Sequence, residues 1–496
     1  MAHASSKSIP NLSGRDLAIL AAAVTLGACI YLLTSWFTYR IGFPLDDSWI
    51  HLTYARNLAL HGQWAFQLGH PSAGSTAPFW TFLLALGFWL GLAPYFWTYL
   101  LGGLTLFGLA ALSEQTARRM LPAYNPRLPW IGLFFAAEWH FLWASMSGME
   151  TLLHALLVTA VLAALMTGSR RYLTFGLLTG LSVWVRPDGL TLIAPVALTI
   201  FLVEKSATQK GRALVLYFIG FGSLFVPYLL FNLWLSGTPM PNTFYAKQME
   251  YAAWQAQPLL NRLTELLVQL SIGPGAILFP GVAAMIILAV RRKSWPVIAS
   301  MLWCGGYLLL YILRLPVYQH GRYLMPAMPS FFLFGLLALL EFQKSDLFRR
   351  LQWAVKTFWL ISLVFVTLLF VGLGAQSYGN DVGLIESEMV VTAKWVAQNL
   401  PPDAVIAAHD IGALGYFDDH QLIDLAGLVS PEVIPFMRDE SQLAVFLNQR
   451  KANYLIAFPA FYPDLTRGLQ PVFVSGGKFA PAIQEKNMAV YDWSGH

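Results

Sequence analysis

Charged residues are scarce in this sequence. Asp, Glu, Lys and Arg together make up 11% of the 496 residues, whereas 57% of the residues are hydrophobic. Because a soluble domain carries about 25% charged residues, this composition excludes an ordinary water-soluble protein. The hydrophobic residues come in long continuous blocks, which is typical of helices that span a lipid bilayer.

Cysteine is nearly absent as well. The two cysteines, Cys29 and Cys304, both lie in hydrophobic segments, which excludes a disulfide framework and a cysteine-based metal cluster. The residues before Cys29 faintly resemble a lipoprotein cleavage site, but the hydrophobic run over 17–37 continues past them and is too long for the core of a signal peptide. We therefore expect an uncleaved first span.

The sequence also lacks long basic stretches. Its formal net charge is +5, and most Lys and Arg residues gather in short clusters between hydrophobic blocks. Such clusters usually set the orientation of a protein in the membrane. We therefore expect the lipid bilayer, and no nucleic acid, as a partner.

The hydrophobic blocks predict a polytopic α-helical membrane protein with about eleven transmembrane helices. A further block at 76–94 either crosses the membrane or forms a re-entrant or interfacial segment on the outer side. Only the second option brings the basic clusters to one side, which favours a multi-pass protein of the cell (inner or plasma) membrane with a cytoplasmic N-terminus. The predicted spans cover residues 17–37, 97–113, 128–146, 150–167, 172–185, 188–203, 213–235, 273–290, 295–313, 323–341 and 353–375.

The chain changes character after Ala375. More than half of its 26 acidic residues follow this position, and a helical stretch is expected near 386–400. We predict a transmembrane domain over 1–375, whose first outer loop covers 38–96, and a small extracytoplasmic α/β domain over 376–496. Apolar runs of strand length occur in the second domain at 404–408, 421–425, 453–458 and 488–491.

Two adjacent carboxylates, Asp46 and Asp47, follow the first span. Carboxylates so close to the hydrocarbon layer are energetically costly and usually functional. If a helix begins here, its spacing places Asp47, His51 and Tyr54 on one face. The alternative is an interfacial helix that is capped by an Asp and carries ordinary polar residues.

The run DDSWIHLTYARNL from Asp46, followed by GSTAPFW, resembles the first periplasmic loop of C-type (GT-C) membrane glycosyltransferases. Within this superfamily, which also contains the protein O-mannosyltransferases, the chain is most similar to the branch of the mycobacterial terminal arabinofuranosyltransferases. The similarity extends over residues 38–433 and rests on the order of several short matches. These are SGMET from Ser147, VRPDG from Val185, PNTFYAK from Pro241, GRY from Gly321, DIGALGY from Asp410 and DLAGL from Asp424.

The resemblance implies an inverting transfer of a sugar, a pentofuranose or a hexose, from a polyprenyl-phosphate carrier to a hydroxyl of a cell-envelope glycan, lipid or protein. A phosphate leaves as an anion without needing a proton, so one carboxylate base is sufficient, whereas glycoside hydrolysis needs two carboxylates. In the family the first acidic residue of this loop is the usual base. Asp46 is therefore the predicted base and Asp47 its orienting partner, although the sequence also allows the opposite assignment.

A departing phosphate needs fixed positive charge near the outer surface. The candidate residues for binding it are Arg322, Lys247, Arg186 and Arg56. Ordinary alternatives exist, since Arg322 could extend its charged end to the membrane interface and Arg186 could pair with Asp188 in a Pro-Asp-Gly turn.

Polar and aromatic side chains of the outer loops and the tail are candidates for substrate binding. Glu150 could instead stabilise a helix N-terminus. His409 and Asp410, which follow the predicted strand at 404–408, are explained nearly as well by a tight structural turn. No cofactor is expected, and a divalent metal near the Asp pair is chemically feasible but not predicted. The candidates are His51, Tyr54, Glu150, Tyr245, His320, His409 and Asp410.

Two other functions fit part of this pattern. A flippase or transporter of lipid-linked sugars would show paired, similar halves and binding groups at the bilayer midplane, but the sequence has no such halves and its ionisable residues cluster at the outer surface. A non-catalytic scaffold would not need the carboxylate pair or Arg322. The sequence therefore favours a polyprenyl-phosphate-sugar-dependent glycosyltransferase.

Overall fold

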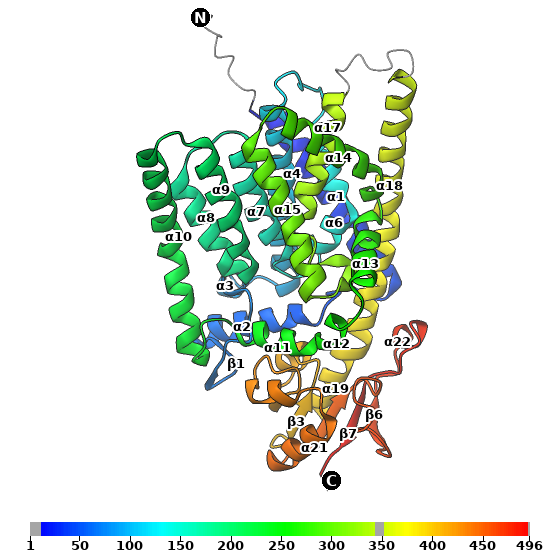
Figure 1. Ribbon diagram of the computed structural model, residues 1–496. Coiled ribbons are helices and arrows are strands. Elements are labelled where there is room, and N and C mark those ends of the chain that lie inside the picture. The colour runs from blue at the N-terminus through cyan, green and yellow to red at the C-terminus, as the bar shows by residue number, and fades with distance from the viewer. Residues whose placement is uncertain (1–10, 343–351, 495–496) are drawn as a thin grey trace, which may run out of the picture.

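The computed structural model describes residues 11–342 and 352–494, and most of them are helical. Figure 1 shows a bundle of upright helices, short helices across its lower end and a small sheet below. Within the described residues, a sixth crossing arises if α13 (Leu259–Ser271) and α14 (Gly275–Arg291), which meet at 103°, count as one span. The five helices that are long and apolar enough to cross a membrane are α1 (Gly14–Thr38), α4 (Pro94–Met120), α10 (Ala207–Ser236), α15 (Trp295–Arg314) and the helix over Trp353–Asn399.

Shorter apolar helices of 10–17 residues pack between these. The long helices make the chain a multi-pass membrane protein. A bilayer core of about 30 Å needs about 20 helical residues, and the short helices are below this length. The number of eleven crossings therefore stays a prediction. The shorter helices are α3 (Pro78–Trp89), α7 (Thr151–Met166), α8 (Tyr172–Val185), η1 (Pro187–Leu192) continued by α9 (Ile193–Val203), and α17 (Met328–Phe342).

The hydrophobic block expected as a span over 128–146 is broken in its middle. It forms α5 (Trp130–Ala137) and α6 (Trp139–Ser145), because Glu138 between them adopts an extended backbone with φ −69° and ψ 124°. The Glu138 carboxylate caps α6 by accepting a hydrogen bond from the backbone amide of Phe141 at 3.2 Å. One polar residue therefore divides this segment into two short helices.

Helices α8 and α10 pack closely through glycine. A Cβ atom at Gly176 of α8 would lie 2.0 Å from the carbonyl oxygen of Tyr217, and one at Gly220 of α10 would lie 2.3 Å from that of Leu173. Small residues allow two helix backbones to approach in this way within a membrane. Both glycines are therefore needed for the spacing of this helix pair.

Gly176→Val is expected to destabilise the protein by about 1–3 kcal/mol, because its side chain would push α10 away from α8. Thermal unfolding of the purified protein in detergent measures the change. The matched control is Gly222→Val on α10, where a Cβ atom meets nothing within 4 Å. Equal unfolding temperatures for the two variants would contradict this account of the helix pair.

Short helices lie across the lower end of the bundle, between the upright helices and the C-terminal sheet (Figure 1). The first of them, α2, directly follows the loop after α1, and α11 and α12 follow α10. This layer brings the first loop and the loop after α10 to the same end of the bundle. Its elements are α2 (Asp47–His61), the hairpin β1 (Ala65–Gln67) and β2 (His70–Pro71), α11 (Asn242–Glu250), α12 (Ala252–Gln255) and the short turn α16 (Tyr318–Gly321).

The last long helix connects the bundle to the C-terminal sheet. It consists of α18 (Gln352–Ile385), the π-helical turn η2 (Glu386–Val390) and α19 (Val391–Asn399), and it passes position 375 without a break. The helical stretch expected near 386–400 is therefore the continuation of the last span. In Figure 1 this helix runs along one edge of the bundle down to the sheet.

A five-stranded mixed sheet follows, with strand order β4-β3-β5-β7-β6. Strand β3 is parallel to β4 and β5, and β7 is antiparallel to β5 and β6. The four runs of strand length correspond to β3, β4, β5 and β7, and β6 is an additional strand. The elements are β3 (Val405–Ala408), α20 (Gly412–Phe417), β4 (Gln421–Asp424), η3 (Pro431–Phe436), α21 (Glu440–Gln449), β5 (Tyr454–Ala457), β6 (Pro471–Val474), α22 (Phe479–Ala482) and β7 (Ala489–Asp492).

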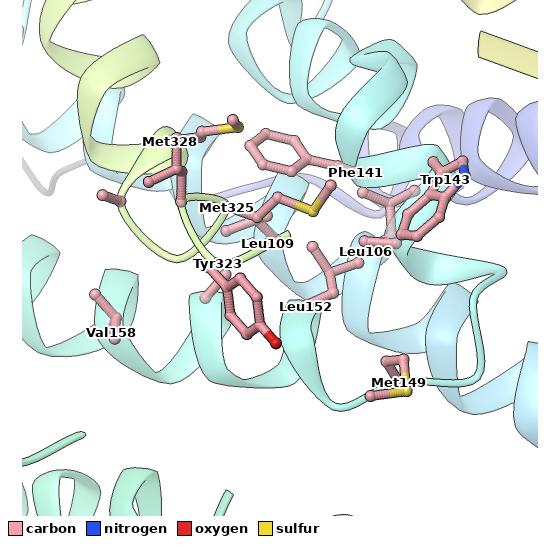
Figure 2. Close-up of a cluster of buried hydrophobic side chains, with 14 of the residues drawn as sticks. Leu106, Leu109, Phe141, Trp143, Met149, Leu152, Val158, Tyr323, Met325 and Met328 are labelled. Carbon is pink, nitrogen blue, oxygen red and sulfur yellow. The ribbon is translucent and has the colours of Figure 1, made fainter. Parts of the chain in front are cut away.

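Buried hydrophobic side chains from several helices support one end of the bundle interior. Figure 2 shows Met149 in the turn before α7 and Leu152 in the first turn of α7, on the side of Trp143 of α6 and of Tyr323. All four side chains are at most 6% exposed. This packing fixes the positions of Trp143, Met149 and Tyr323, which also line the cavity described next.

Candidate functional site

A cavity of about 850 Å³ lies where the bundle, the short helices and the C-terminal loops meet. Its lining residues extend along the chain from Pro44 to Glu485, so the fold collects them from most of the sequence. Most of the residues predicted for the site line this cavity: Asp46, Asp47, His51, Glu150, Arg186, Lys247, His320, Arg322, His409 and Asp410.

Asp46 stands at the N-terminus of α2 but does not cap that helix. Its carboxylate instead accepts two hydrogen bonds from the first turn of α20, from the amide of Gly412 to Oδ2 at 2.6 Å and from the amide of Ala413 to Oδ1 at 2.8 Å. Burial and the nearby Asp410 carboxylate raise the pKa of Asp46 to about 7, against the lowering effect of these two amides. Asp46 is therefore a buried carboxylate that can take up a proton near neutral pH.

Asp47 is turned toward the cations. Its Oδ2 lies 2.7 Å from Nη2 of Arg322, and its side chain is 38% exposed. Burial alone would raise the pKa of Asp47, but Arg322 and then Lys247 hold this pKa below its usual value. The two adjacent carboxylates thus differ, because Asp47 is a stable anion paired with a guanidinium.

Arg322 keeps unused hydrogen-bond donors. The residue is 4% exposed, and its Nε and Nη1 atoms are buried without a hydrogen-bond partner among the described residues. An unsatisfied buried donor on a charged group costs about 1–3 kcal/mol or more. A guanidinium with two free donors at a cavity is suited to bind an anion such as a phosphate.

Three cationic side chains surround the phenol ring of Tyr323. Its hydroxyl oxygen accepts hydrogen bonds from Nζ of Lys247 at 2.6 Å and from Nη2 of Arg322 at 3.0 Å, while the guanidinium of Arg186 lies 5.5 Å from the ring centroid. Burial would raise the pKa of Tyr323, but Arg322 and Lys247 lower it to about 8. The GRY match contained this residue, yet only the structure shows that it joins the predicted cations.

A buried chain of ionisable residues continues from α2. Nε2 of His51 lies 3.3 Å from Oε2 of Glu150, whose Oε1 lies 3.0 Å from Nη1 of Arg186, and Nε of Arg186 lies 3.1 Å from Oδ2 of Asp188. Burial would raise the pKa of Glu150, but His51 and Arg186 hold it well below its usual value. Arg186 therefore pairs with Asp188, as the turn suggested, and also borders the cavity.

The segment before Arg322 has an unusual backbone. Gln319, His320 and Gly321 have φ values of 52°, 57° and 68°, a region that non-glycine residues rarely adopt. Nε2 of His320 lies 2.8 Å from Oδ2 of Asp381 on α18, which helps to hold this turn. Such backbone strain clusters at functional sites, and here it precedes the arginine that faces Asp47.

The structure places Arg56 away from the cavity. Its guanidinium donates to the backbone oxygens of Tyr416 at 2.6 Å and of Gly415 at 3.2 Å, and it borders a second cavity of about 660 Å³. Arg56 is nine residues after Asp47, which is half a turn around the helix. The prediction that Arg56 binds the donor phosphate is therefore at odds with its position.

Tyr54 and Tyr245 are also absent from the described lining of the main cavity. The hydroxyl of Tyr54 lies 2.6 Å from Oγ of Ser72 and accepts from the amide of Gly74 at 3.0 Å, so it holds the loop after β2. Tyr245 packs edge-on against Phe244 with centroids 5.4 Å apart, and Phe244 lines the cavity in its place.

Several lining residues escaped the sequence analysis. Helical spacing from Lys247 could have indicated Glu250 and Tyr251, which follow it by three and four residues, but nothing local indicated Asp381 or Glu485. In the part of the chain that the structure describes, no three His, Cys, Asp or Glu side chains are arranged to hold a metal ion. The lining residues not named in advance include Glu250, Tyr251, Tyr311, Tyr318, Tyr323, Asp381, Phe461 and Glu485.

Comparisons with known sequences match different parts of the chain. Residues 380–491 match the model of a domain of unknown function, DUF8728. The sequence is also 28% identical over 256 residues to a terminal beta-(1->2)-arabinofuranosyltransferase of Mycobacterium tuberculosis (strain ATCC 25618 / H37Rv). This similarity covers 48% of the chain and 39% of that relative, so the chain spans well under half of the relative's length.

Comparisons with solved structures cover nearly the whole chain. ArnT from Cupriavidus metallidurans bound to undecaprenyl phosphate is similar with a TM-score of 0.58 at 15% identity, over 97% of this chain and 99% of that one. The oligosaccharyltransferase AglB from Archaeoglobus fulgidus, in complex with an inhibitory peptide and a dolichol-phosphate, gives 0.61 at 12% identity, over 90% and 69%. Arabinofuranosyltransferase AftD from Mycobacteria gives 0.51 at 15% identity, over 98% and 42%. At these identities the likeness concerns the fold.

Proposed function

Because the chain has the fold of C-type (GT-C) membrane glycosyltransferases, we propose that it is an inverting glycosyltransferase that uses a polyprenyl-phosphate-linked sugar. The donor sugar is a pentofuranose or a hexose, and the acceptor is a hydroxyl of a cell-envelope glycan, lipid or protein. The observation that carries the proposal is the meeting of Asp46, Asp47 and Arg322 at one cavity, where two buried donors of Arg322 have no partner in the described part of the chain.

The cationic wall of the cavity supports binding of the donor phosphate. Arg322 has N–H groups without a partner among residues 11–342 and 352–494, and Lys247 and Arg186 lie beside it around Tyr323. Similar proteins have been solved with undecaprenyl phosphate and with a dolichol-phosphate, which supports a carrier of this kind here. In a cavity of low dielectric constant, these cations stabilise the negative charge that develops on the leaving phosphate.

Asp46 is the proposed base. A carboxylate has about four lone-pair positions, so two remain after the hydrogen bonds from Gly412 and Ala413. As the acceptor oxygen forms its bond to the anomeric carbon, the bond from that carbon to the phosphate oxygen breaks and its electron pair stays on the phosphate. The proton of the acceptor hydroxyl passes to Asp46, and attack opposite the leaving phosphate inverts the anomeric carbon.

Asp47 has the supporting role in this mechanism. Its ion pair with Arg322 keeps it ionised and holds the guanidinium toward the cavity. The site lies on the outer side of the cell membrane in this proposal, since the first loop and the C-terminal sheet share one end of the bundle and the basic loop between α9 and α10 lies toward the other.

The purified protein in lipid nanodiscs is expected to release free polyprenyl phosphate from a matching carrier-linked sugar when an envelope fraction supplies the acceptor. A panel of polyprenyl-phosphate-linked pentofuranoses and hexoses identifies the donor, and chromatography of the lipid product measures the release. The control omits the envelope fraction. Movement of intact carrier across a liposome membrane without release of polyprenyl phosphate would indicate a flippase and contradict the proposal.

A further inference from the structure

The loop over residues 410–413 connects the C-terminal sheet to the proposed base. It leaves the end of β3 and begins α20, within the segment that matches a domain of unknown function. The amides of Gly412 and Ala413 bind both carboxylate oxygens of Asp46, from a position more than 360 residues later in the chain. The C-terminal segment therefore reaches the catalytic cavity itself.

The approach of this loop to Asp46 is close enough to require glycine. A Cβ atom at Gly412 would lie 2.0 Å from the carbonyl oxygen of Asp46 and 2.7 Å from its Oδ2. The Asp46 backbone and the loop can therefore come this close only because Gly412 has no side chain. Any larger residue would move the carboxylate relative to the cavity.

Asp410 adds a second carboxylate to the same place. It lines the cavity, and its Oδ2 is buried without a hydrogen-bond partner in the described part of the chain. By contrast, the Asp424 carboxylate at the end of β4 accepts hydrogen bonds from the amides of Ala426, Leu428 and Val429. An ionised carboxylate without such hydrogen bonds still repels neighbouring negative charges, which raises the pKa of a nearby carboxyl group.

The charged groups that face these two carboxylates come from several elements. Asp47 on α2 and Asp410 act on Asp46, while Asp47, Glu250 at the end of α11 and Asp424 act on Asp410. Arg322 and Lys247 are paired with Asp47 and Tyr323, and His409 faces the Tyr462 hydroxyl at 2.8 Å. The neighbours that act most directly on Asp46 are thus acidic.

We propose that the loop over 410–413 is part of the catalytic machinery: the amides of Gly412 and Ala413 orient the carboxylate of Asp46, and the carboxylate of Asp410 keeps Asp46 a strong enough base. This inference rests on the proposed function. Asp410 is then a positioning residue that acts through Asp46, and the domain of unknown function gains a role in catalysis.

The pH dependence follows from the sign of this interaction. Burial and then the Asp410 charge raise the pKa of Asp46 to about 7, and burial and then the charges of Asp47, Glu250 and Asp424 raise the pKa of Asp410 to about 7. The base must be ionised to accept a proton. The rate therefore falls as the pH drops through the apparent pKa of the coupled Asp46 and Asp410 carboxyl groups. Removing the charge of Asp410 lowers the pKa of Asp46, so the acidic limb of the profile moves to lower pH.

Asp410→Asn is therefore expected to shift the acidic limb of polyprenyl-phosphate release downward by about one pH unit. Initial rates are measured between about pH 5 and 9 with the active donor from the panel. If Asp410→Asn does not fold, Asp410→Ser, which also removes the charge, is measured in its place. The matched control is Asp419→Asn, which changes an exposed carboxylate of the same segment and leaves the limb in place. An unshifted limb in Asp410→Asn, with only a higher KM for the acceptor, would overturn the inference.

Gly412→Ala tests the orienting amides independently. We expect the rate at the pH optimum to fall by about 10- to 100-fold, because the Asp46 carboxylate is displaced, while binding of polyprenyl phosphate is unchanged. The control Gly305→Ala adds a Cβ atom that meets nothing within 4 Å. A wild-type rate for Gly412→Ala would refute the role of the loop, whereas an inactive wild-type protein would refute the proposed function instead.

Discussion

Asp46→Asn is expected to lower the release of polyprenyl phosphate by about 10²- to 10⁴-fold, the usual contribution of a general base. An amide cannot take the proton from the acceptor hydroxyl, so bond formation to the anomeric carbon loses its assistance. The measurement is the initial rate with the active donor and the envelope fraction. Binding of the carrier lipid should be retained, because the cations around Tyr323 are unchanged.

Two comparisons make the result for Asp46 specific. The Asn side chain has only one acceptor oxygen for the amides of Gly412 and Ala413, so thermal unfolding must confirm that the variant is folded. Asp47→Asn should reduce the rate by weakening the position of Arg322, but it should retain an acidic limb set by Asp46, moved to lower pH because the Asp47 charge also raises the pKa of Asp46. Near-normal turnover in Asp46→Asn, together with an inactive Asp47→Asn, would assign the base to Asp47.

Arg322→Lys is expected to reduce transfer by about 10²-fold. The change keeps one positive charge but removes the planar guanidinium, whose Nη2 binds Asp47 while Nε and Nη1 are buried without a hydrogen-bond partner among the described residues. A lysine offers a compact charge that cannot hold both partners in this geometry. The reduction should appear in the rate and in the affinity for polyprenyl phosphate, measured by ligand-dependent thermal stabilisation.

Arg56→Lys is the matched control for this prediction. Arg56 lies on the same helix as Asp47, but its guanidinium binds the carbonyl groups of Gly415 and Tyr416, outside the main cavity. We expect its rate and its affinity for polyprenyl phosphate to stay near those of the wild type. If Arg56→Lys and Arg322→Lys lowered carrier binding equally, the assignment of Arg322 to the phosphate would be wrong.

Local sequence predicted the parts of the site that depend on short-range chemistry. The Asp pair follows the first span, and Asp47 and His51, one helical turn apart, both line the cavity. Tyr54 has the same spacing but is not among the described lining residues; its hydroxyl accepts a hydrogen bond from the amide of Gly74. Helical periodicity gives the direction of a side chain but not the extent of the cavity beside it.

The helix boundaries were also predicted from the sequence in one case and missed in another. The predicted span over 172–185 coincides with α8, because its apolar block is bounded by charged residues at both ends. The block over 128–146 contains Glu138, which can either stay inside one helix or cap a new one. Its carboxylate accepts a hydrogen bond from the amide of Phe141 at 3.2 Å, so in the structure Glu138 caps a new helix, an outcome that the apolar block alone did not indicate.

The sequence by itself determined that the chain is a membrane protein and where its acidic pair stands, because composition and spacing are local properties. Tertiary structure alone decided that Gly412 and Ala413 hold Asp46, that Arg322 faces Asp47 and that Arg56 turns away. The physical reason is that these contacts join residues hundreds of positions apart. Their hydrogen-bond partners are mainly backbone groups, which every residue type carries and which therefore leave no signal in the sequence.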